Sequence, residues 1–451
     1  MNNWETVKLK EVFKHKKRNI LINDTEEYKL CRVQVRRKGV LLREKQKGKS
    51  IKTKKQQVCK AGDFIVAEMD AKFGGYGFIP AELDGAIVSS HYYLFEFDKS
   101  KMIEEYFQTL INTDFIQNQI EAKGSTNYSS IRAWEFLEYN IPLPSLKVQK
   151  KIAHRFMMFF NFKSELGKDT NKQMEIIKKL RQSILQEAIE GKLTFDWRKE
   201  NPVRKGDPDY DAEALLMAVA KHKEKSIKDK TIKDGTQTSV SKTNRTTKIP
   251  KNWKYCKGNN IFFVTKLAGF EYTKYINLKE SGEIPVVRAQ NVKPLVLDKT
   301  NLLYIDKSVS LLLERCALTK PCLLVTFIGA GIGDVALFSE KERWHLAPNV
   351  AKMEPLDEQF VNLKYMIYFL LSSDGQKEML KHIKATAQPS LSMGTIRDID
   401  YIIPPKAEQD IIVERIERLM DGVNMIQREV IQRQEQSNLL INAVLKEAFN
   451  N

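Results

Sequence analysis

Residues 143–152 read LPSLKVQKKI, and residues 403–412 read IPPKAEQDII. Each stretch places proline ahead of a glutamine that opens a run with helical periodicity, because proline cannot lie inside a helix without breaking it. Gln149 and Gln409 lie 260 residues apart, and the same register pairs Ser130 with Ser390, Ile184 with Val444 and Glu187 with Glu447. The chain therefore contains an internal repeat, and each copy ends in a long helix.

Both helical runs carry apolar residues at a four–three spacing, which is typical of a coiled coil. We expect the helices to pair, and an antiparallel pair would relate the two halves by a pseudo-two-fold axis. The alternative is that each helix packs separately onto its own half. The expected seam consists of Ile152, Phe156, Phe159, Leu166, Ile177, Leu180, Ile184, Ile412, Ile416, Leu419, Val423, Ile426, Val430, Leu440 and Val444.

The rest of each half is rich in predicted strands. Residues 62–67, 85–90 and 322–327 are turns followed by apolar runs. A helix should follow in each half, at about residues 101–123 and 359–385. Residues 211–220 should form a short helix, and the Lys-rich stretch 221–248 should be exposed and mobile because it cannot bury enough apolar surface.

These features predict an α+β fold class: two strand-rich globular domains joined by two long helices that form an antiparallel coiled coil, with an internal repeat. The expected segments are domain 1 over 1–147, helix 1 over 148–192, a linker with a short helix over 193–248, domain 2 over 249–405 and helix 2 over 406–451.

The chain has 451 residues, a formal net charge of +17 and a pI of about 9.3. Such a basic balance favours a polyanionic partner such as nucleic acid, although a solvated basic surface would give the same totals. The five cysteines form no CxxC pair, and the six histidines show no metal-ligand spacing. With no apolar run long enough to span a membrane and no signal peptide, we expect a cytoplasmic protein with reduced thiols and no metal.

Enzyme signatures are incomplete. Residues 48–50 read GKS, but a phosphate-binding loop would need glycine where Arg43 stands. The glycine turn at 329–333 follows an apolar run and is similar to the glycine motif of S-adenosylmethionine methyltransferases. The Asn/Asp-Pro-Pro-aromatic tetrad of DNA amino-methyltransferases does not occur. We therefore expect no catalytic residue, and a self-sufficient DNA adenine methyltransferase using residues 329–333 is the alternative.

The sequence does supply side chains suited to DNA, since arginine, asparagine and glutamine can pair bidentately with purine edges and glycines allow close backbone approach. For any one of them, a solvated loop position is an equally good interpretation, and a coiled-coil scaffold without base readout is a further option. The candidates in the first half are Arg36, Arg37, Lys38, Lys72, Gly74, Gly75, Tyr76, Ser90 and His91. Those in the second half are Arg288, Gln290, Asn291, Gly331, Gln388, Ser390 and Ser392.

The chain resembles the specificity subunits of type I restriction–modification systems over nearly its whole length. The resemblance rests on the two duplicated helix starts, on LRQSILQEAIEGKL at 180–193, on DWR at 196–198 and on KIPKNW at 248–253. One departure is the last helix, which ends in KEAFNN without the Gly-Lys-Leu found at 191–193.

The resemblance implies two target recognition domains, each reading one half of a bipartite, asymmetric DNA site, with the helices setting the spacer. It implies double-stranded DNA, two modification subunits and restriction subunits as partners, and no membrane. No cofactor would bind this chain. The modification subunits would bring S-adenosylmethionine, and the restriction subunits would use ATP and Mg²⁺.

Overall fold

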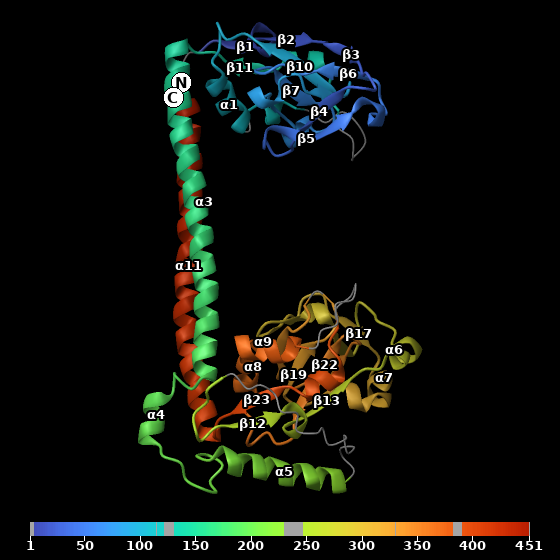
Figure 1. Ribbon diagram of the computed structural model, residues 1–451, viewed down its shortest axis with the longest axis vertical. Coiled ribbons are helices and arrows are strands. Elements are labelled where there is room, and N and C mark those ends of the chain that lie inside the picture. Colours follow the sequence, from blue (N-terminus) through green and yellow to red (C-terminus); the bar gives the residue numbers. More distant parts are fainter. Residues whose placement is uncertain are drawn as a thin grey trace. The chain divides into compact units, whose positions relative to one another are not determined.

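The computed structural model describes residues 4–113, 115–120, 130–229, 247–329, 331–381 and 390–450, leaving out the side chains of 441, 442 and 444–450. The chain forms two compact units, one of residues 1–170 with 431–451 and one of residues 171–430. Each unit holds one strand-rich domain and a part of both long helices (Figure 1). The predicted mobility of residues 230–246 and the candidate Gln388 lie outside the described residues.

The domain of the first unit consists of β1 (Thr6–Lys8), β2 (Phe13–Lys16), β3 (Asn19–Leu21), β4 (Glu27–Val33), β5 (Val40–Lys47), β6 (Lys55–Val58), β7 (Phe64–Ala67), β8 (Tyr76–Phe78), β9 (Ile87–Val88), β10 (Tyr92–Phe97), α1 (Glu104–Asn112), α2 (Ala133–Leu137) and β11 (Asn140–Pro142). One sheet has the order β2-β10-β7-β8 and another the order β3-β6-β9-β4-β5. Strand β1 pairs with β11, so the start of this domain is hydrogen-bonded to the segment that leads into the first long helix.

Strand β7 explains why this domain has two apolar layers. Successive side chains of a strand point to opposite faces. Phe64 and Val66 therefore face one cluster, in which the Phe64 and Phe107 rings lie 5.1 Å apart, whereas Ile65 faces a second cluster that includes Val33 of the five-stranded sheet. A strand buried on both faces reads as a continuous apolar run, which is the pattern of residues 64–67.

The domain of the second unit consists of β12 (Lys254–Lys257), β13 (Phe262–Lys266), α6 (Gly269–Tyr275), β14 (Ile284–Val287), β15 (Val292–Lys293), β16 (Val296–Leu297), β17 (Leu303–Ile305), α7 (Lys307–Leu312), β18 (Ala317–Leu318), β19 (Cys322–Thr326), β20 (Val335–Phe338), β21 (Trp344–Leu346), β22 (Val350–Pro355), α8 (Leu363–Leu371), α9 (Ser373–Leu380), α10 (Met393–Arg397) and β23 (Asp400–Ile403). Its central sheet has the order β13-β22-β19-β20, and β12 pairs with β23. This arrangement repeats β2-β10-β7-β8 and β1-β11 of the first unit.

The two glutamines that define the repeat have the same structural role. The side chain of Gln149 accepts a hydrogen bond from the backbone N–H of Ile103 at 2.9 Å, and Gln409 accepts one from Asn362 at 3.0 Å. Both glutamines are fully buried. Each glutamine therefore fastens the first turn of a long helix to the residue that precedes α1 or α8 of its own domain, which confirms the internal repeat.

Three predicted helices have different limits in the structure. The helix expected over 101–123 is α1, which ends at Asn112 because Thr113 takes an extended conformation. The helix expected over 359–385 is split by Ser372, whose hydroxyl caps α9 by accepting from Gly375. The short helix expected over 211–220 is α5 (Ala212–Lys228), so its C-terminal part is ordered where an exposed mobile stretch was predicted.

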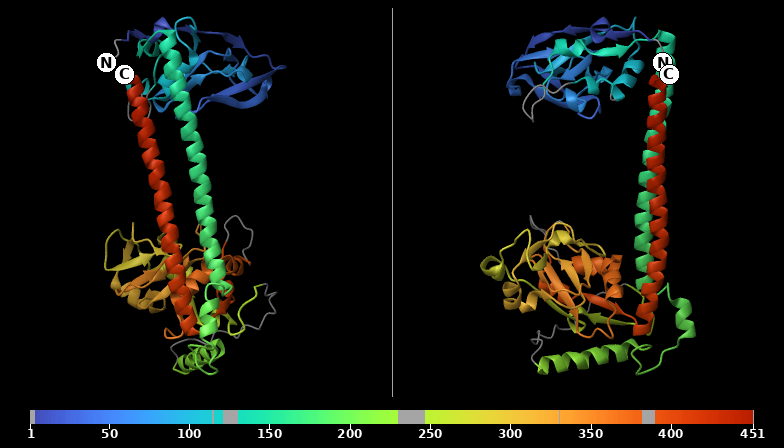
Figure 2. Two further views of the ribbon diagram at one scale, coloured as in Figure 1. Left: turned by 90° about the vertical axis from the view of Figure 1, so that its left-hand side faces the viewer. Right: turned by 180° about the vertical axis from the view of Figure 1, so that it is seen from behind.

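The long helices α3 (Leu146–Ile189) and α11 (Lys406–Asn450) are antiparallel where both lie in the second unit. Arg181 donates to Asn424 at 2.7 Å, whereas further along the chain Asp196 accepts from Arg415 at 2.5 Å. Residue numbers thus rise along one partner as they fall along the other, and Figure 2 shows the two helices side by side in this unit.

The contact between these helix segments buries Ile177 and Ile184 of α3 and Ile416, Val423 and Val430 of α11. In the first unit Ile152 and Phe156 are buried, and Ile152 packs against the domain core. Phe159 and Leu166 are half-buried, Ile412 is buried in the core of the second unit, and Val444 lies among the side chains that are not described.

The seam prediction is wrong for four other positions, whose side chains are exposed. Leu180, Leu419, Ile426 and Leu440 are exposed by 40%, 42%, 50% and 65%. The four–three spacing is correct, but on α11 every second seam position falls one residue later, at Met420 rather than Leu419. Leu419 and Met420 are both apolar, so hydrophobicity alone could not choose between them; at the next shifted position the half-buried residue is the polar Gln427 rather than Ile426.

A buried carboxylate joins the start of α11 to the beginning of the second domain. Glu408 is fully buried and accepts hydrogen bonds from Thr194 at 2.8 Å, from the Trp253 indole N–H at 2.7 Å and from Arg198. Arg198 lies in α4 (Phe195–Glu200), directly after the turn at Gly191 that ends α3. This cluster therefore fixes three chain segments to one another within the second unit.

The five cysteines are free thiols, and the Sγ atoms of Cys31 and Cys59 lie 3.7 Å apart in the first domain. None of the helices in the described ranges has the length and apolar character needed to span a lipid bilayer. In the same ranges no group of three or more His, Cys, Asp or Glu side chains is arranged to hold a metal ion.

Candidate nucleic-acid interface

Two hairpin tips meet on the first domain and bring most of its candidate residues together. Residues 34–39 connect β4 to β5, and residues 68–75 connect β7 to β8. The backbone N–H of Arg36 donates to Phe73 at 2.6 Å, and that of Arg37 donates to Gly74 at 3.0 Å. The basic cluster and the glycine-rich stretch, which are distant in sequence, therefore form one surface.

Arg36 and Arg37 both have a φ of 60°, in the left-handed region that favours glycine. Their side chains have different roles. The Arg37 guanidinium donates to the backbone carbonyl of Asn112 at 3.0 Å and to Gln117. Arg37 therefore braces the tip against the end of α1, whereas the Arg36 and Lys38 side chains are exposed.

The glycines of the second tip are required by close packing. Gly74 has a φ of 78°, and a Cβ atom on it would lie 2.9 Å from the backbone nitrogen of Arg37. A Cβ on Gly75 would lie 2.8 Å from the carbonyl oxygen of Asp70. Lys72 is half-buried, and its carbonyl accepts from the Gln117 amide at 2.8 Å. Gly74 and Gly75 therefore shape the surface, and the backbone of Lys72 supports it, while the Lys72 side chain stays a candidate for contact with DNA.

Tyr76 does not belong to this surface. It is 1% exposed, and its ring lies 6.0 Å from that of Phe64 in the domain core. The first residue of β8 points inward because strand side chains alternate between the two faces of the sheet. The sequence prediction that Tyr76 contacts DNA is therefore corrected.

A polar cluster flanks the β7–β8 tip. Glu68 accepts hydrogen bonds from Arg132 at 2.8 Å and from the imidazole of His91 at 2.9 Å. The hydrogen bond that Arg132 shares with Tyr93 raises the pKa of the arginine further, so its charge is secure. His91 and Ser90 are exposed, as is Arg132, which sequence reasoning missed because it stands alone in the sequence.

The second domain repeats the two tips. Its β15–β16 turn carries Leu295, which has a φ of 68° and donates its backbone N–H to Val335 at 2.9 Å, at the end of the β19–β20 loop. The side chain of Gln376 donates to Gly333 in that loop, as Gln117 donates to Lys72 in the first domain. The two-tip arrangement is therefore present in both domains. The β15–β16 tip of the second domain is apolar, whereas the β4–β5 tip of the first domain is basic.

The candidates at residues 288–291 differ in how exposed their side chains are. Asn291 is 1% exposed, and its amide donates to the Asp298 carbonyl at 2.9 Å. It holds a loop in place and is unavailable to DNA, which corrects the sequence prediction. Arg288 is half-buried and donates to the Asn301 carbonyl at 2.6 Å, whereas Gln290 is exposed.

The remaining candidates of the second domain lie at or near the β19–β20 loop. Ser390 is exposed and forms a β-bridge with Ile328 of this loop. Ser392 is exposed, but its hydroxyl accepts from Thr395 at 2.9 Å and caps α10. Gly331 lies in the loop itself, where a Cβ would meet the Asp334 carboxylate at 2.7 Å.

The glycine turn at 329–333 does not have the form of a nucleotide-binding motif. Such motifs follow a parallel strand and open a helix whose N-terminus binds phosphate. Here the glycines connect β19 to β20, which pair antiparallel from Cys322 with Phe338 to Val325 with Val335. The alternative of a self-sufficient methyltransferase therefore loses the motif on which it depended.

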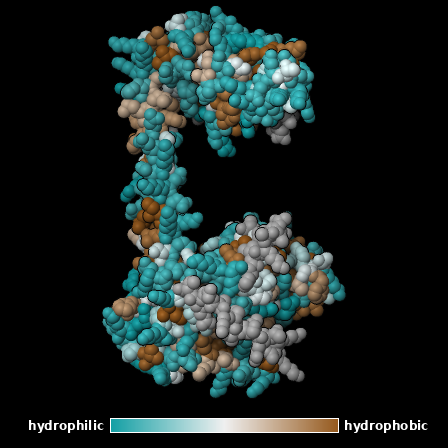
Figure 3. Space-filling view, viewed as in Figure 1, coloured by the Kyte–Doolittle hydropathy of each residue, from teal (hydrophilic) through white to brown (hydrophobic). Residues whose placement is uncertain are grey.

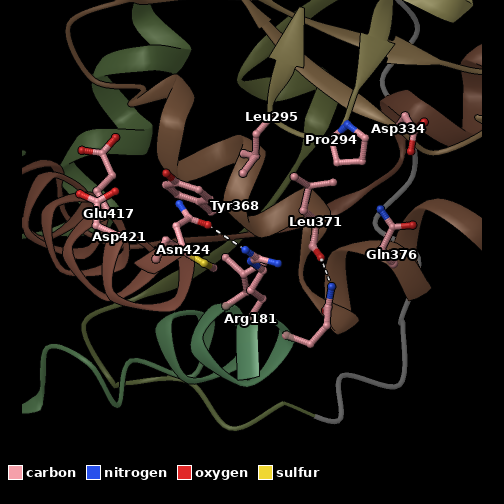
Figure 4. Close-up of a pocket in the computed structure, with 13 residues that line it drawn as sticks. Arg181, Pro294, Leu295, Asp334, Tyr368, Leu371, Gln376, Glu417, Asp421 and Asn424 are labelled. Atoms are coloured by element: carbon pink, nitrogen blue, oxygen red, sulfur yellow. Dashed lines mark hydrogen bonds between the residues drawn. The ribbon is translucent and has the colours of Figure 1, made fainter. Parts of the chain in front are cut away.

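A cleft of about 670 Å³ lies in the second unit between the helix pair and the hairpin tips. Figure 4 shows Pro294, Leu295 and Asp334 on one side of it and Arg181 and Glu417 on the other. Burial raises the pKa of Asp334. Because carboxylates outnumber cations in its lining, this cleft does not favour a phosphate group.

Comparison with known proteins agrees with this architecture. The sequence profile of the type I restriction modification DNA specificity domain matches residues 1–176 and 250–435. The Escherichia coli type I restriction enzyme EcoBI specificity subunit is 23% identical over 309 residues, which cover 68% of this chain and 57% of that protein. The chain thus spans little more than half the length of that curated relative.

One further relative and one solved structure match over greater lengths. The type I restriction enzyme MjaVIII specificity subunit of Methanocaldococcus jannaschii is 21% identical over 462 residues, which cover 98% of this chain and 92% of that protein. A chain in a solved structure concerned with complex assembly and conformational transition of the type I R-M system aligns over 100% of this chain and 98% of that one, with a TM-score of 0.62 at 14% identity. This likeness confirms the expected fold class. The chain belongs to the family of the type I restriction modification DNA specificity domain, and the two profile matches fall on the two halves of its internal repeat.

Proposed function

We propose that this chain is the DNA-recognition subunit of a type I restriction–modification complex and that it reads a bipartite, asymmetric site in double-stranded DNA. The observation that carries the proposal is the presence of the same pair of hairpin tips in two domains of one chain, with different side chains on them. Two domains with the same arrangement of hairpin tips but different side chains on those tips are suited to reading two different half-sites. The net charge of +17 supports binding to a polyanion.

We assign residues 1–147 and 249–405 to the two target recognition domains, 148–192 and 406–451 to the helices that separate the half-sites, and 193–248 to the linker. Catalysis would belong to partner subunits, because the chain's one methyltransferase-like motif is a hairpin turn. Modification subunits would bring S-adenosylmethionine and methylate adenine, and restriction subunits would use ATP and Mg²⁺. We place the complex in the cytoplasm, where its DNA substrate is accessible.

The helix pair offers a surface on which modification subunits could dock. In the second unit Ile176 and Leu180 of α3 are exposed by 55% and 40%, and Leu419 and Ile426 of α11 by 42% and 50%. Residues four or seven positions apart lie on one face of a helix, so each helix carries an apolar stripe. Figure 3 shows hydrophobic groups interrupting the hydrophilic surface of the helices.

The proposal is tested by exchanging one domain. Replacing residues 1–147 with another recognition domain should change one half-site and leave the other half-site and the spacer unchanged. A change in both half-sites would contradict the modular assignment. Equilibrium dialysis of the purified chain with S-adenosylmethionine should show no stoichiometric binding, and tight binding would instead favour a methyltransferase.

A further inference from the structure

The backbone at Arg36 is held in a conformation that a different residue would adopt at lower cost. At a φ of 60° the Cβ of an L-residue is crowded, and glycine is the usual occupant. Backbone strain of this kind is found preferentially at binding sites, where the contribution of a side chain to binding outweighs the folding stability that its strained conformation costs. Arg37 shares the conformation, and its bonds to Asn112 and Gln117 explain its presence. Within the described ranges, the exposed Arg36 guanidinium makes no hydrogen bond of this kind.

Arg36 lies beside an exposed aromatic ring from the other tip. Phe73 is 60% exposed although it is a large apolar residue, and its carbonyl accepts the Arg36 N–H. The two side chains, with Val35, Arg37 and Gln117, line a surface hollow of about 590 Å³. A planar cation and an apolar ring therefore stand together at the rim of one concave site.

The site is rigid, which matters for base readout. Gln117 binds both the Arg37 guanidinium and the Lys72 carbonyl, so one side chain connects the two tips to the segment that follows α1. Gly74 packs so closely on Arg37 that even a methyl group would displace the tip. Preorganised groups lose little entropy on binding and can discriminate by geometry. A contact with a phosphate group needs only a positive charge on a flexible side chain, which the neighbouring Lys38 provides.

We propose that Arg36 and Phe73 are specificity-determining residues of the first recognition domain: Arg36 donates two hydrogen bonds to the O6 and N7 atoms of a guanine in the major groove, and Phe73 contacts the neighbouring base pair, with a thymine methyl as the preferred surface. This inference rests on the proposed function. The equivalent tip of the second domain carries Pro294 and Leu295, which have no donor side chains, so only one half-site depends on this guanine.

The experiment uses the full chain, co-expressed with the modification subunits of its own system. The protein is incubated with a pool of duplexes of randomised sequence, and the bound duplexes are sequenced. Arg36→Gly removes the guanidinium and suits the left-handed backbone. It should unfold at the same or a higher temperature, yet lose preference for guanine at one position by about 5-fold to 150-fold while the other half-site is unchanged. Arg36→Lys keeps the charge but should lose most of this preference.

Arg43→Ala is the matched control, since Arg43 is a 63% exposed cation on the same hairpin, away from the tip. It should retain the full preference. Phe73→Ala should weaken the preference at the position next to the guanine.

The inference is overturned if Arg36→Gly weakens binding to all duplexes alike and reduces its salt dependence, because that result identifies a phosphate contact. Unchanged selectivity would overturn it equally. Failure of the proposed function is distinguishable, because the unaltered complex would then select no bipartite sequence at all.

Discussion

Replacing Glu408 with alanine should destabilise the second unit more than any exposed charge substitution. The change removes the acceptor of hydrogen bonds from Thr194, Trp253 and Arg198, and it leaves a guanidinium whose side chain is only 14% exposed without its counter-ion. Removing one partner of a buried ion pair costs about 3–5 kcal/mol. A domain is stable by only about 5–15 kcal/mol, so we expect a folded but easily opened unit.

Because the chain has two units, a single unfolding free energy is not defined, and the local measurement is hydrogen exchange at the amides of β12, which follows Trp253. The free energy of opening derived from exchange at these amides should fall by about 3–5 kcal/mol. In the double variant Glu408→Ala/Arg198→Met, the free energy of opening should fall by less than the sum of the falls in the two single variants, because both substitutions remove the same ion pair. Asp196→Ala, which breaks an exposed pair with Arg415, is the control and should change exchange little. A loss below about 1 kcal/mol for Glu408→Ala would refute the structural role of the carboxylate.

Other substitutions test other parts of the structure. Gly74→Ala should lower the thermal midpoint and weaken selection of the first half-site, because its φ is 78° and the new Cβ would meet Arg37; an unchanged midpoint would contradict the packing. Ile184→Asp should lower the unfolding temperature of the isolated chain strongly, whereas Leu180→Asp should be nearly neutral, and equal losses would contradict the observed seam. Burial lowers the pKa of His345 to about 4, while the unfolded imidazole titrates near 6.5, so the unfolded state binds more protons between these values. The free energy of opening of the second unit, measured by hydrogen exchange, should therefore fall as pH drops through that window, and His345→Gln should flatten the dependence.

Much of the architecture could be predicted from the sequence because the chain repeats itself. The spacing between Gln149 and Gln409 identified equivalent helix starts, and their equivalent hydrogen bonds explain why that residue type stands there. Helix limits were harder, since Thr113 and Ser372 end or divide helices through local backbone and cap geometry. The seam could be predicted only in part, because Leu419 and Met420 are both apolar and tertiary packing selects between them.

The candidate site was predicted as two separate stretches, and the structure shows that they meet. Residue type alone could not separate Arg36 from Arg37, since one presents its side chain and the other braces the tip. Asn291 was chosen for its amide, which in fact binds the backbone of a loop. Phe73 was passed over because exposure of an aromatic ring depends on the tertiary fold.

Mapping methylated adenines in a genome that carries this chain with its modification subunits tests the DNA-reading role most directly. We expect methylation within one bipartite, asymmetric motif whose two half-sites flank a spacer of fixed length, and we expect it to disappear when the gene for this chain is deleted. Methylation at a single continuous motif, or a pattern that persists after the deletion, would contradict recognition by two domains of this chain.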